Sequence, residues 1–378
     1  MIVIKVQSTK EMRDFIRLPQ VIFQDHPCYV PPLWLDEKKA YSAKANPILA
    51  NSDFALLLVL NDDHKPVGRI VVYIDHKYNQ YYQSKTGFFG AFECIDDAGA
   101  AGLLIQTCEV WLRDKGIQVI RGPINPVAEN WGFVFEGYGR APVFMSPWNP
   151  PYYHGFFTGA GYEKAKDLLV YEADILQGYE LPKRYDGFTE KFFERFPGIK
   201  IRQLDLRRIK DDARSIWEIS NIALADNWGY VPLELPVMED MLRKLRLIVD
   251  PNAVWMAEYE GNAVGFCLGF PDINLILKRS KGRLFPLGWA RLLFGVKKLR
   301  DYRLFGLAVH PDWQGRALDA LMYINLYHNL AAKKVRMEAN YILEDNLRIR
   351  NALEKLGMHR IKTYRIYEKS LCHNPSYD

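Results

Sequence analysis

The stretch FGLAVHPDWQGRALDALMYINLY, Phe305 to Tyr327, decides the fold of this chain. It begins as an apolar strand, turns at His310-Pro311, and passes through small and polar residues into a run with helical apolar spacing. The N-terminus of a helix has unpaired N–H groups and a partial positive charge. Small residues there let the backbone approach a pyrophosphate. The stretch therefore predicts a phosphate-binding loop between a strand and a helix.

The landmarks around this stretch occur twice along the chain in the same order, which indicates an internal duplication. The matched pairs are Tyr29-Val30-Pro31 with Tyr230-Val231-Pro232, Val67-Gly68 with Val264-Gly265, FFGAFE (88–93) with LFGLAV (304–309), and Gly161 with Gly357. Each of the last two glycines is followed, ten residues later, by Tyr-Glu.

Each half has the pattern helix pair, strand hairpin, strand, helix, strand, helix, strand. The fold class that we expect is α/β (α+β), with two domains that each hold a mixed, mostly antiparallel sheet flanked by helices. The predicted boundaries are an N-terminal domain over 1–174, a packed connector over 175–199 and a C-terminal domain over 200–378.

The second half resembles the GNAT superfamily of acyl-CoA N-acyltransferases. In that family a strand ends near V-x-P, and Q/R-x-x-G-x-G/A opens the following helix. Here Val309-His310-Pro311 matches the strand end, and residues 314–319 match the loop. Farther on, Asn346 and Gly357 match an Asn that starts a helix and a Gly that ends it. The first half resembles the family more loosely, so the resemblance implies a tandem GNAT-like protein.

The resemblance implies a co-substrate, acetyl-CoA or a longer acyl-CoA, and the residues that would bind it. Backbone groups near Leu307 and Val309 would pair with the pantetheine arm. The residues expected at the phosphates and nearby are Gln314, Gly315, Arg316, Ala317, Leu318, Asp319 and Asn346.

Three positions depart from the family pattern. Ala317 replaces the first glycine and Asp319 the second small residue, while Leu353 replaces the tyrosine that protonates the departing thiolate. A carboxylate about 4 Å from a phosphate charge costs roughly 4 kcal/mol at an effective dielectric of 20. Alternatively, Asp319 points away and favours the helix N-terminus.

The first copy departs further, because Asp96-Asp97-Ala98-Gly99-Ala100 stands at the phosphate loop and Phe157 at the tyrosine position. It is expected to be architectural, or one wall of the acceptor site. Residues 121–126 (RGPINP) and 130–140 are either a ligand site or a packed surface loop.

N-acyl transfer needs a base for the amine proton and a proton donor for the thiolate. Glu338 is the first candidate for the base, with a salt-bridged strand carboxylate as the alternative. Tyr364 and Tyr367 are candidate donors, although core packing suits at least one of them. Glu344 and Asp345 are expected to cap the helix that follows. Trp228 and Tyr230 either shape the acceptor pocket, as the resemblance implies, or belong to a turn.

The chain has a net charge of +5, but residues 278–303 alone hold nine Lys or Arg and one acid, so the rest is slightly acidic. This uneven distribution argues against a nucleic-acid partner. The apolar middle of the insertion, 284–296, suits peripheral contact with an anionic membrane, a lid over the acyl-CoA, or a basic helix packed on its domain.

The five cysteines are scattered and form no CxxC pair, which indicates reduced thiols and no zinc site. The N-terminal residues do not have the pattern of a signal peptide, and no apolar run is long enough for a membrane helix. We therefore expect a cytoplasmic protein without a bound metal.

Together these features predict an acyl-CoA-dependent N-acyltransferase, in which a small-molecule acceptor amine attacks the thioester directly, because no cysteine is placed as a nucleophile. The alternative is a non-catalytic acyl-CoA-binding or interaction protein on the same scaffold, which Leu353 and Asp319 favour.

Overall fold

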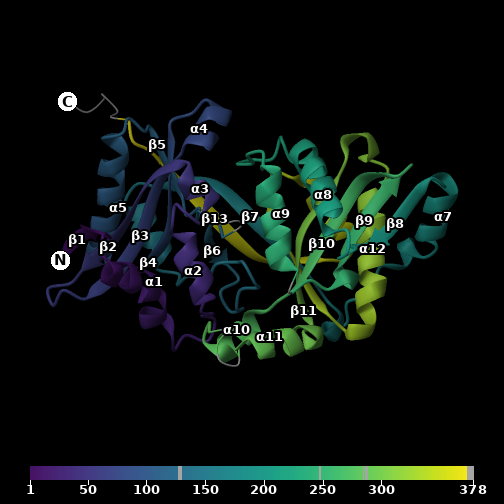
Figure 1. Ribbon diagram of the computed structural model, residues 1–378, viewed down its shortest axis with the longest axis horizontal. Coiled ribbons are helices and arrows are strands. Elements are labelled where there is room, and N and C mark those ends of the chain that lie inside the picture. Colours follow the sequence, from purple (N-terminus) through teal and green to yellow (C-terminus); the bar gives the residue numbers. More distant parts are fainter. Residues whose placement is uncertain (127–129, 247, 284, 286–287, 373–378) are drawn as a thin grey trace. The chain divides into compact units, whose positions relative to one another are not determined.

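The computed structural model describes residues 1–126, 130–246, 248–283, 285 and 288–372 (Figure 1). The chain forms two compact units, each built from strands in mixed parallel and antiparallel pairing and from helices, as the fold class predicted. Unit 1 contains residues 1–168, 277–284 and the chain from Lys362 onward; unit 2 contains 169–276 and 285–361.

Among the described strand pairs of unit 1, β4 and β5 run parallel and the others are antiparallel. Its strands, in spatial order, are β1 (Ile2–Lys5), β2 (Ser52–Leu60), β3 (Pro66–Asp75), β4 (Thr86–Cys94), β5 (Val119–Gly122) and β13 (His359–Ser370), and β6 (Phe133–Glu136) also pairs with β13. Its helices are α1 (Thr9–Phe23), α2 (Trp34–Ala40), α3 (Pro47–Ala50), α4 (His76–Tyr82), α5 (Ala98–Arg113) and α6 (Tyr153–Gly159).

The core of unit 1 lies between the sheet, α5 and α6. Every third or fourth residue of α5 is buried, including Leu104, Cys108 and Leu112, as the helical spacing predicted. The rings of Phe89 and Phe157 stack with centroids 4.7 Å apart, so the position that holds a tyrosine in the GNAT pattern is a core phenylalanine here.

Unit 2 has the strand order β7 (Glu163–Asp174, in this unit from Leu169 onward), β12 (Arg336–Leu343), β11 (Asp301–Val309), β10 (Asn262–Pro271), β9 (Val254–Tyr259) and β8 (Ile199–Gln203). Strands β11 and β12 are parallel, and β8 to β11 are antiparallel neighbours. The helices are α7 (Phe188–Arg195), α8 (Ile209–Ala223), α9 (Leu235–Leu245), α10 (Asn274–Ser280), α11 (Gly288–Gly295), α12 (Leu318–Leu330) and α13 (Leu347–Lys355), and α10 ends in unit 1. The short 3-10 turns are η1 (Ile175–Gln177), η2 (Lys183–Tyr185), η3 (Pro251–Ala253), η4 (Val296–Lys298), η5 (Pro311–Trp313) and η6 (Ala331–Lys333).

The two faces of the unit 2 sheet are covered by different helices. Cys267 of β10 belongs to a core cluster with residues of α7 and α12, whereas its neighbour Leu268 lines an apolar space with Leu242 and Leu245 of α9. Since successive strand residues point to opposite faces, α7 and α12 lie on one side and α8 and α9 on the other.

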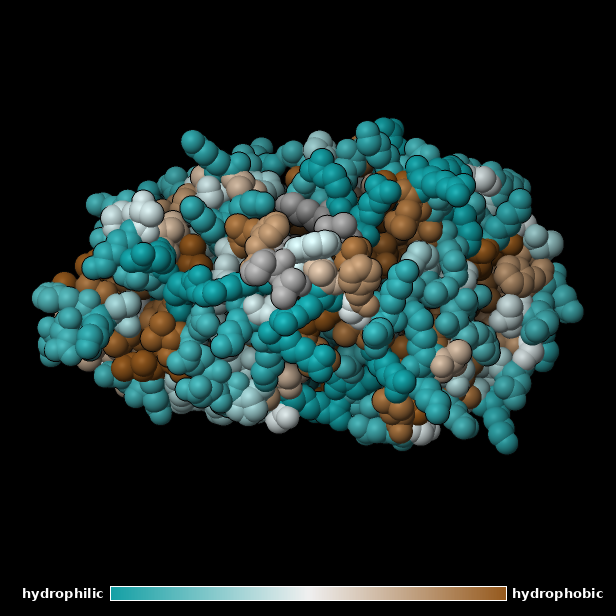
Figure 2. Space-filling model, turned by 60° about the horizontal axis from the view of Figure 1, so that its bottom comes forward, coloured by the Kyte–Doolittle hydropathy of each residue, from teal (hydrophilic) through white to brown (hydrophobic). Residues whose placement is uncertain are grey.

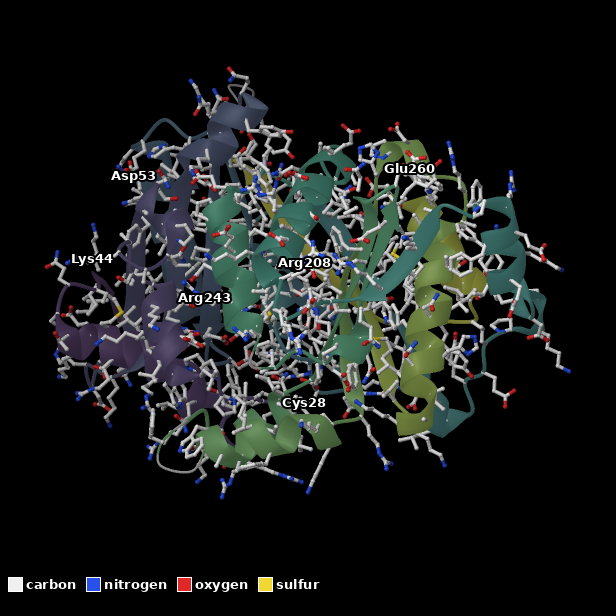
Figure 3. The ribbon with its side chains drawn as sticks, turned by 45° about the vertical axis from the view of Figure 1, so that its right-hand side comes forward. Cys28, Lys44, Asp53, Arg208, Arg243 and Glu260 are labelled. Atoms are coloured by element: carbon white, nitrogen blue, oxygen red, sulfur yellow. The ribbon has the colours of Figure 1, made fainter. Side chains whose placement is uncertain are left out.

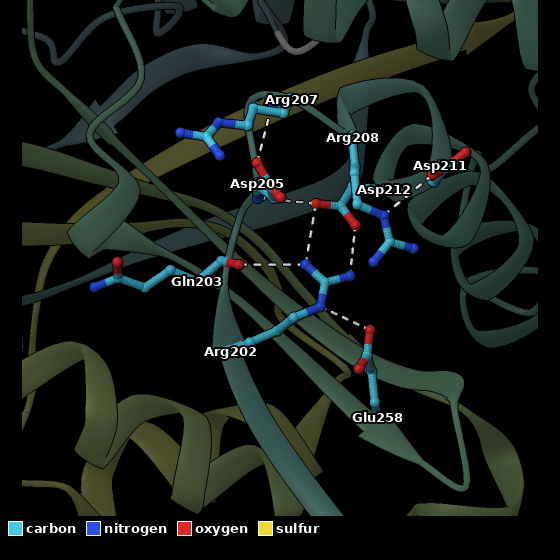
Figure 4. A network of polar contacts seen from close by, with 8 residues as sticks. All are labelled: Arg202, Gln203, Asp205, Arg207, Arg208, Asp211, Asp212 and Glu258. Carbon is cyan, nitrogen blue, oxygen red and sulfur yellow. Dashed lines mark hydrogen bonds and ion pairs between the residues drawn. The ribbon is translucent and has the colours of Figure 1, made fainter.

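A polar network fixes α8 to the edge of this sheet (Figure 4). Arg202 of β8 donates to both carboxylate oxygens of the buried Asp212, at 2.5 and 3.1 Å, and to Glu258 of β9 at 2.7 Å. Arg208 precedes α8, and Glu260 lies in the tight turn of the predicted β9–β10 hairpin (Figure 3).

The compact units differ from the predicted domain boundaries in three places: residues 169–174 belong to unit 2, whereas residues 277–284 and most of the C-terminal strand belong to unit 1. Residues Tyr367–Ser370 of β13 pair with β5, and Thr363–Arg365 pair with β6, so the last strand of the chain belongs to unit 1. The sequence predicted that 200–378 would form one domain. Residues 175–199 belong to unit 2, where Phe192 is buried and the Tyr179 hydroxyl donates to the Leu356 carbonyl at 2.8 Å.

Candidate active site

The candidate site of unit 2 begins where its two central parallel strands separate. The ladder between β11 and β12 runs from Asp301–Arg336 to Leu304–Ala339, and no pairing of these strands follows within the described residues. Beyond it, Phe305, Gly306 and Leu307 are half-buried. Among the described residues, no strand pairs with β11 near Leu307 and Val309 on that side, so a ligand with amide groups can pair with this edge.

A β-bulge at Phe305 shapes this edge. Gly306 is opposite Leu268, but Leu304 is opposite Gly269, so Phe305 is the extra residue. Because of the bulge, Leu304 and Leu307 both pack on the α12 side of the sheet although they are three residues apart.

The predicted phosphate loop follows β11 and leads into α12. Gly315 and Ala317 both have left-handed backbone conformations, with φ of 76° and 61°, and Ala317 is the N-cap of α12. A left-handed residue with a Cβ costs roughly 1–2 kcal/mol, which a glycine avoids. Ala317 thus takes the conformation for which the family pattern has glycine, and the helix N-terminus forms in spite of the substitution.

The polar side chains of the loop have partners within unit 2. Gln314 donates from Nε2 to the Val309 carbonyl at 3.0 Å and accepts from Arg348 at 2.7 Å, so it braces the loop. The guanidinium of Arg316 lies 4.8 Å from the ring centre of Trp313. It borders an open cleft whose lining is Arg195, Phe196, Pro197, Gly198, Tyr259, Asp312, Trp313 and Arg316.

Leu318 and Asp319 form the start of α12. Leu318 is fully buried, so only its backbone can face a ligand. Asp319 is half-buried in the first turn, where a negative charge favours the helix. Burial raises the pKa of Tyr323 well above its usual range, and the charges of Cys267 and Asp319 add to this effect. The Asp319 carboxylate therefore acts on the residue one turn farther along α12.

The next helix, α13, contains two positions of the family pattern, Asn346 at its start and Leu353 near its end. Asn346 is itself the N-cap of α13, since its side-chain oxygen accepts from the Ile349 N–H at 3.2 Å; the prediction that Glu344 or Asp345 caps this helix was wrong. Leu353 of α13, at the position of the family tyrosine, is fully buried and packs in the core of unit 2.

A cluster of buried charges lies at the split. Glu338 of β12 is 1% exposed and lies 3.7 Å from the guanidinium of Arg336. Its register partner on β11 is Arg303, which is 2% exposed. The Arg303 guanidinium lies 5.2 and 5.4 Å from the ring centres of Phe305 and Tyr341.

Sequence reasoning missed Arg303 and Tyr341. Arg303 was counted among the cations of the basic insertion, but it is a buried residue of β11. Its position between Tyr302 and Leu304, inside an apolar strand, was the signal that could have identified it. Tyr341 is half-buried on β12 just past the last β11–β12 rung.

The two predicted catalytic residues belong to different compact units. Glu338 lies in unit 2, whereas Tyr364 is a fully buried residue of β13 in unit 1, opposite Val134 of β6. The hydroxyl of Tyr367 contacts Nδ1 of His154 at 2.6 Å, also in unit 1. The catalytic roles of Glu338 and Tyr364 remain predictions.

Trp228 and Tyr230 are half-buried in the loop between α8 and α9. The Tyr230 hydroxyl donates to Asn221 of α8 at 2.7 Å, and the same Asn221 oxygen accepts from the Leu233 N–H at 3.0 Å. This loop is thereby held on the α8–α9 face of the sheet.

The corresponding split in unit 1 is filled by its own chain. Strands β4 and β5 pair from Thr86–Val119 to Phe88–Arg121. Beyond this, the Ile124 N–H donates to the Phe89 carbonyl at 2.7 Å, and the Ala91 N–H donates to the side chain of Asn125. A Cβ on Gly90 would lie 2.6 Å from the Ile124 carbonyl oxygen. The RGPINP segment is therefore a packed segment that occupies the edge of β4.

The loop before α5 also differs from a phosphate site. The side chain of Asp97 accepts from the Ala100 N–H at 2.9 Å, so a carboxylate caps the helix. Together with the filled split, this cap supports an architectural role for the first copy.

Comparisons with known proteins give relatives by sequence and solved structures with a similar fold. No family model matches the chain. It is 30% identical over 378 residues to the bacterial ceramide synthase of Caulobacter vibrioides, covering 98% of this chain and 97% of that protein. It is also 30% identical over 377 residues to protein YghO of Escherichia coli, covering 96% and 94%.

Solved structures match along nearly the whole length of this chain, among them the following two. A tandem GNAT protein from the clavulanic acid biosynthesis pathway has a TM-score of 0.56 and 11% identity, covering 99% of both chains. A GCN5-related N-acetyltransferase from Sphaerobacter thermophilus has a TM-score of 0.54 and 15% identity, covering 98% of this chain and 96% of its own. These matches confirm the predicted tandem GNAT fold.

Proposed function

Since this chain belongs to the same family as the bacterial ceramide synthase of Caulobacter vibrioides, and has the tandem GNAT fold of acyltransferases, we propose that it transfers an acyl group from an acyl-CoA thioester to an amine. The observation that carries the proposal is the split between β11 and β12 beside the N-terminus of α12.

The acyl-CoA would lie along this split. Its pantetheine amides would pair with the backbone of β11 near Leu307 and Val309, and its pyrophosphate would accept from the N–H groups around Ala317 and Leu318. Gln314 supports the loop from behind, because both ends of its side-chain amide already have partners.

The acceptor we propose is a long-chain amino alcohol. A ceramide is the amide of such an amine with a fatty acid, and the Caulobacter relative is named for making one. The sequence match to this relative covers nearly the whole of both chains, so the same class of acceptor is the first to test here. The α8–α9 loop with Trp228 and Tyr230 is the candidate wall for this amine.

In the proposed reaction, the amine nitrogen attacks the thioester carbonyl directly. Glu338 takes the proton of the amine, either directly or through a water molecule, while N–H groups of β11 stabilise the oxyanion. The C–S bond then breaks, the amide forms, and the CoA thiolate takes a proton. Arg336, at 3.7 Å, and Arg303 on the neighbouring strand place positive charge beside Glu338.

The proton donor for the thiolate is a separate question, because Leu353 has no proton to give. Tyr341 lies at the split in the same compact unit as Glu338, and Tyr364 lies in unit 1. We therefore place Tyr341 ahead of Tyr364. A Tyr341→Phe variant with a lowered kcat and an altered alkaline limb of the pH profile would support this order; the same change in Tyr364→Phe alone would reverse it.

The test of the function is a transfer assay with purified protein. Acetyl-CoA and a long-chain acyl-CoA are each offered with a long-chain 2-amino-1,3-diol or a short amine, and free thiol and amide product are measured. Glu338→Gln is expected to lower kcat by about 100-fold or more while the Kd for acyl-CoA stays similar. Glu260→Gln, in the exposed β9–β10 turn, is the matched control (Figure 3).

Each outcome of this assay has a defined meaning. Full activity in Glu338→Gln rejects Glu338 as the base. Binding of acyl-CoA without thiol release for any amine supports the alternative, a non-catalytic acyl-CoA-binding protein. Absence of both binding and turnover overturns the proposed function.

A further inference from the structure

Unit 2 has an exposed apolar surface on and beside α11. Its large side chains are Phe285, 73% exposed, Trp289, 50%, Leu293, 54%, and Phe294, 70%. Trp289 and Leu293 are one helical turn apart, so they share a face of α11. Leu284, Pro286 and Leu287, which the sequence included in this segment, lie outside the described residues. An exposed group of two Phe, one Trp and one Leu within ten residues marks an interaction surface.

The same segment is strongly basic. Residues 273–300 contain eight Lys or Arg and no Asp or Glu, and all eight are exposed. Four of them belong to unit 2 with the apolar side chains: Arg291, Lys297, Lys298 and Arg300. The cations therefore flank the apolar group without an acid between them, which complements an anionic partner.

The other side of the segment is fixed to unit 2. Gly288, Val296 and Leu299 are buried, and a Cβ on Gly295 would lie 3.0 Å from the side chain of Ile276. The outward direction of Trp289, Leu293 and Phe294 thus follows from the packing of the opposite side. Figure 2, which brings the lower side of Figure 1 forward, shows hydrophobic side chains among hydrophilic ones on this side of the molecule.

We propose that α11 and its flanks dock the protein onto the surface of an anionic lipid bilayer, with Phe285, Trp289, Leu293 and Phe294 among the headgroups. Aromatic side chains and flanking cations are the composition of helices that lie in the membrane interface. None of the helices in the described part of the chain is long and apolar enough to cross a bilayer, and α11 has eight residues. The segment therefore lies on the bilayer and does not span it.

Two other occupants fit the charge less well. A symmetric contact with a second copy would bring the four unit 2 cations of one chain against those of the other, with no acid in the segment to offset them. In a lid over the acyl-CoA, the cations would contact the CoA phosphates, but this contact would not account for the four large apolar side chains. The membrane uses both the apolar and the basic residues, and this docking does not depend on the acyl-transfer proposal.

The test is co-sedimentation of the full chain with vesicles of phosphatidylcholine alone or enriched in phosphatidylglycerol. The wild-type protein is expected to bind the anionic vesicles and to be released by high salt. The variant Trp289→Ser/Leu293→Ser/Phe294→Ser is expected to bind at least 10-fold more weakly. Lys297→Gln/Lys298→Gln/Arg300→Gln is expected to weaken binding to anionic vesicles.

Matched controls separate this surface from general effects. Ile222→Ser removes an apolar side chain of α8 that is 51% exposed, and Lys10→Gln/Lys44→Gln/Lys355→Gln removes the same number of charges elsewhere (Lys44 is labelled in Figure 3). Both controls are expected to bind like the wild type. Circular dichroism and thiol release with a water-soluble amine confirm that each variant is folded.

Three results would overturn the proposal: no binding of the wild type to anionic vesicles, equal binding by all variants, or a wild-type dimer in lipid-free buffer that the apolar variant converts to a monomer. Normal vesicle binding without any acyl transfer would count against the proposed function alone.

Discussion

The N–H of Ile124 donates a 2.7 Å hydrogen bond to the carbonyl of Phe89, at the point where β4 and β5 of unit 1 separate. The equivalent point of unit 2, past Leu304 and Ala339, has no such pairing in the described residues. The two copies of the fold therefore differ at this point: in unit 1 the chain itself pairs with the edge of β4, and in unit 2 the described residues leave the equivalent edge of β11 open.

This difference predicts one acyl-CoA per chain. Calorimetric titration is expected to give a stoichiometry near one. Ala317→Glu, which places a bulky acid at the N-terminus of α12, should abolish binding, while Gly99→Glu at the start of α5 should leave it unchanged. Two equivalent sites, or loss of binding in Gly99→Glu, would contradict an architectural first copy.

Leu353 is expected to act only through packing. Because it is fully buried, Leu353→Ala should lower the free energy of unfolding by about 2–5 kcal/mol. Leu353→Met should cost less than about 1.5 kcal/mol, and Leu353→Tyr about 1–3 kcal/mol through overpacking. Denaturant titration measures these changes. A rise in kcat for folded Leu353→Tyr would show that a hydroxyl there can still serve the thiolate.

The buried Arg202–Asp212 ion pair should stabilise unit 2 far more than the exposed Arg208–Asp211 ion pair nearby. Asp212 is 1% exposed, so Arg202→Ala leaves a buried carboxylate without its main cation and should cost about 3–5 kcal/mol. In the Arg208–Asp211 pair both side chains are more than 60% exposed, and Arg208→Ala should cost at most about 1 kcal/mol. Similar losses for the two variants, in chemical unfolding, would refute the structural role of the network in Figure 4.

Glu93 of β4 should make the stability of unit 1 depend on pH. Burial raises its pKa to about 7, against the lowering effects of Arg69 and the Tyr153 hydroxyl. The folded state therefore binds this proton more tightly than the unfolded state, and the stabilisation is present below about pH 4.5 and is lost as pH rises through 7.

Between pH 5 and pH 8, the loss of this proton should lower the free energy of unfolding of the wild type by on the order of 2–3 kcal/mol. Glu93→Gln should remove this contribution, so its Tm should fall less over the same pH range. Some slope should remain, because burial also raises the pKa of Glu37 in the same unit. An unchanged slope in the variant would show that the Glu93 proton is not linked to folding.

The sequence was most informative where structure is decided locally. The loop and α12 follow from small residues and a helical run within one stretch, and the hairpin turn at Glu260 follows from its flanking strands. The burial of Arg303 could not be derived in this way, because its partners Glu338 and Tyr341 belong to a strand more than thirty residues farther along. The start of α13 at Asn346 was expected from the family resemblance, but capping was assigned to Glu344 and Asp345. All three of these consecutive polar residues can cap a helix, and only the backbone geometry decides among them.

The pairing of β13 with strands of unit 1 could not be predicted from the sequence either, because it also depends on contacts between residues far apart along the chain. The repeated Tyr-Glu landmarks at 171 and 367 locate a last strand in each copy, but both copies offer similar neighbours. Long-range pairs such as Arg121 with Glu368, at 2.8 Å, make the choice, and they are visible only in three dimensions.

This choice has a consequence for biosynthesis. The ribosome releases β5 long before β13, because all of unit 2 lies between Gly122 and its partner Tyr367 in the sequence. At about 5–20 residues per second, the nascent first copy waits on the order of 10–50 s with the edge of β5 uncovered. An uncovered edge invites pairing with other chains, so this protein should be most prone to aggregate while it is being made. A stop codon shortly before Lys362 would damage the copy that was translated first.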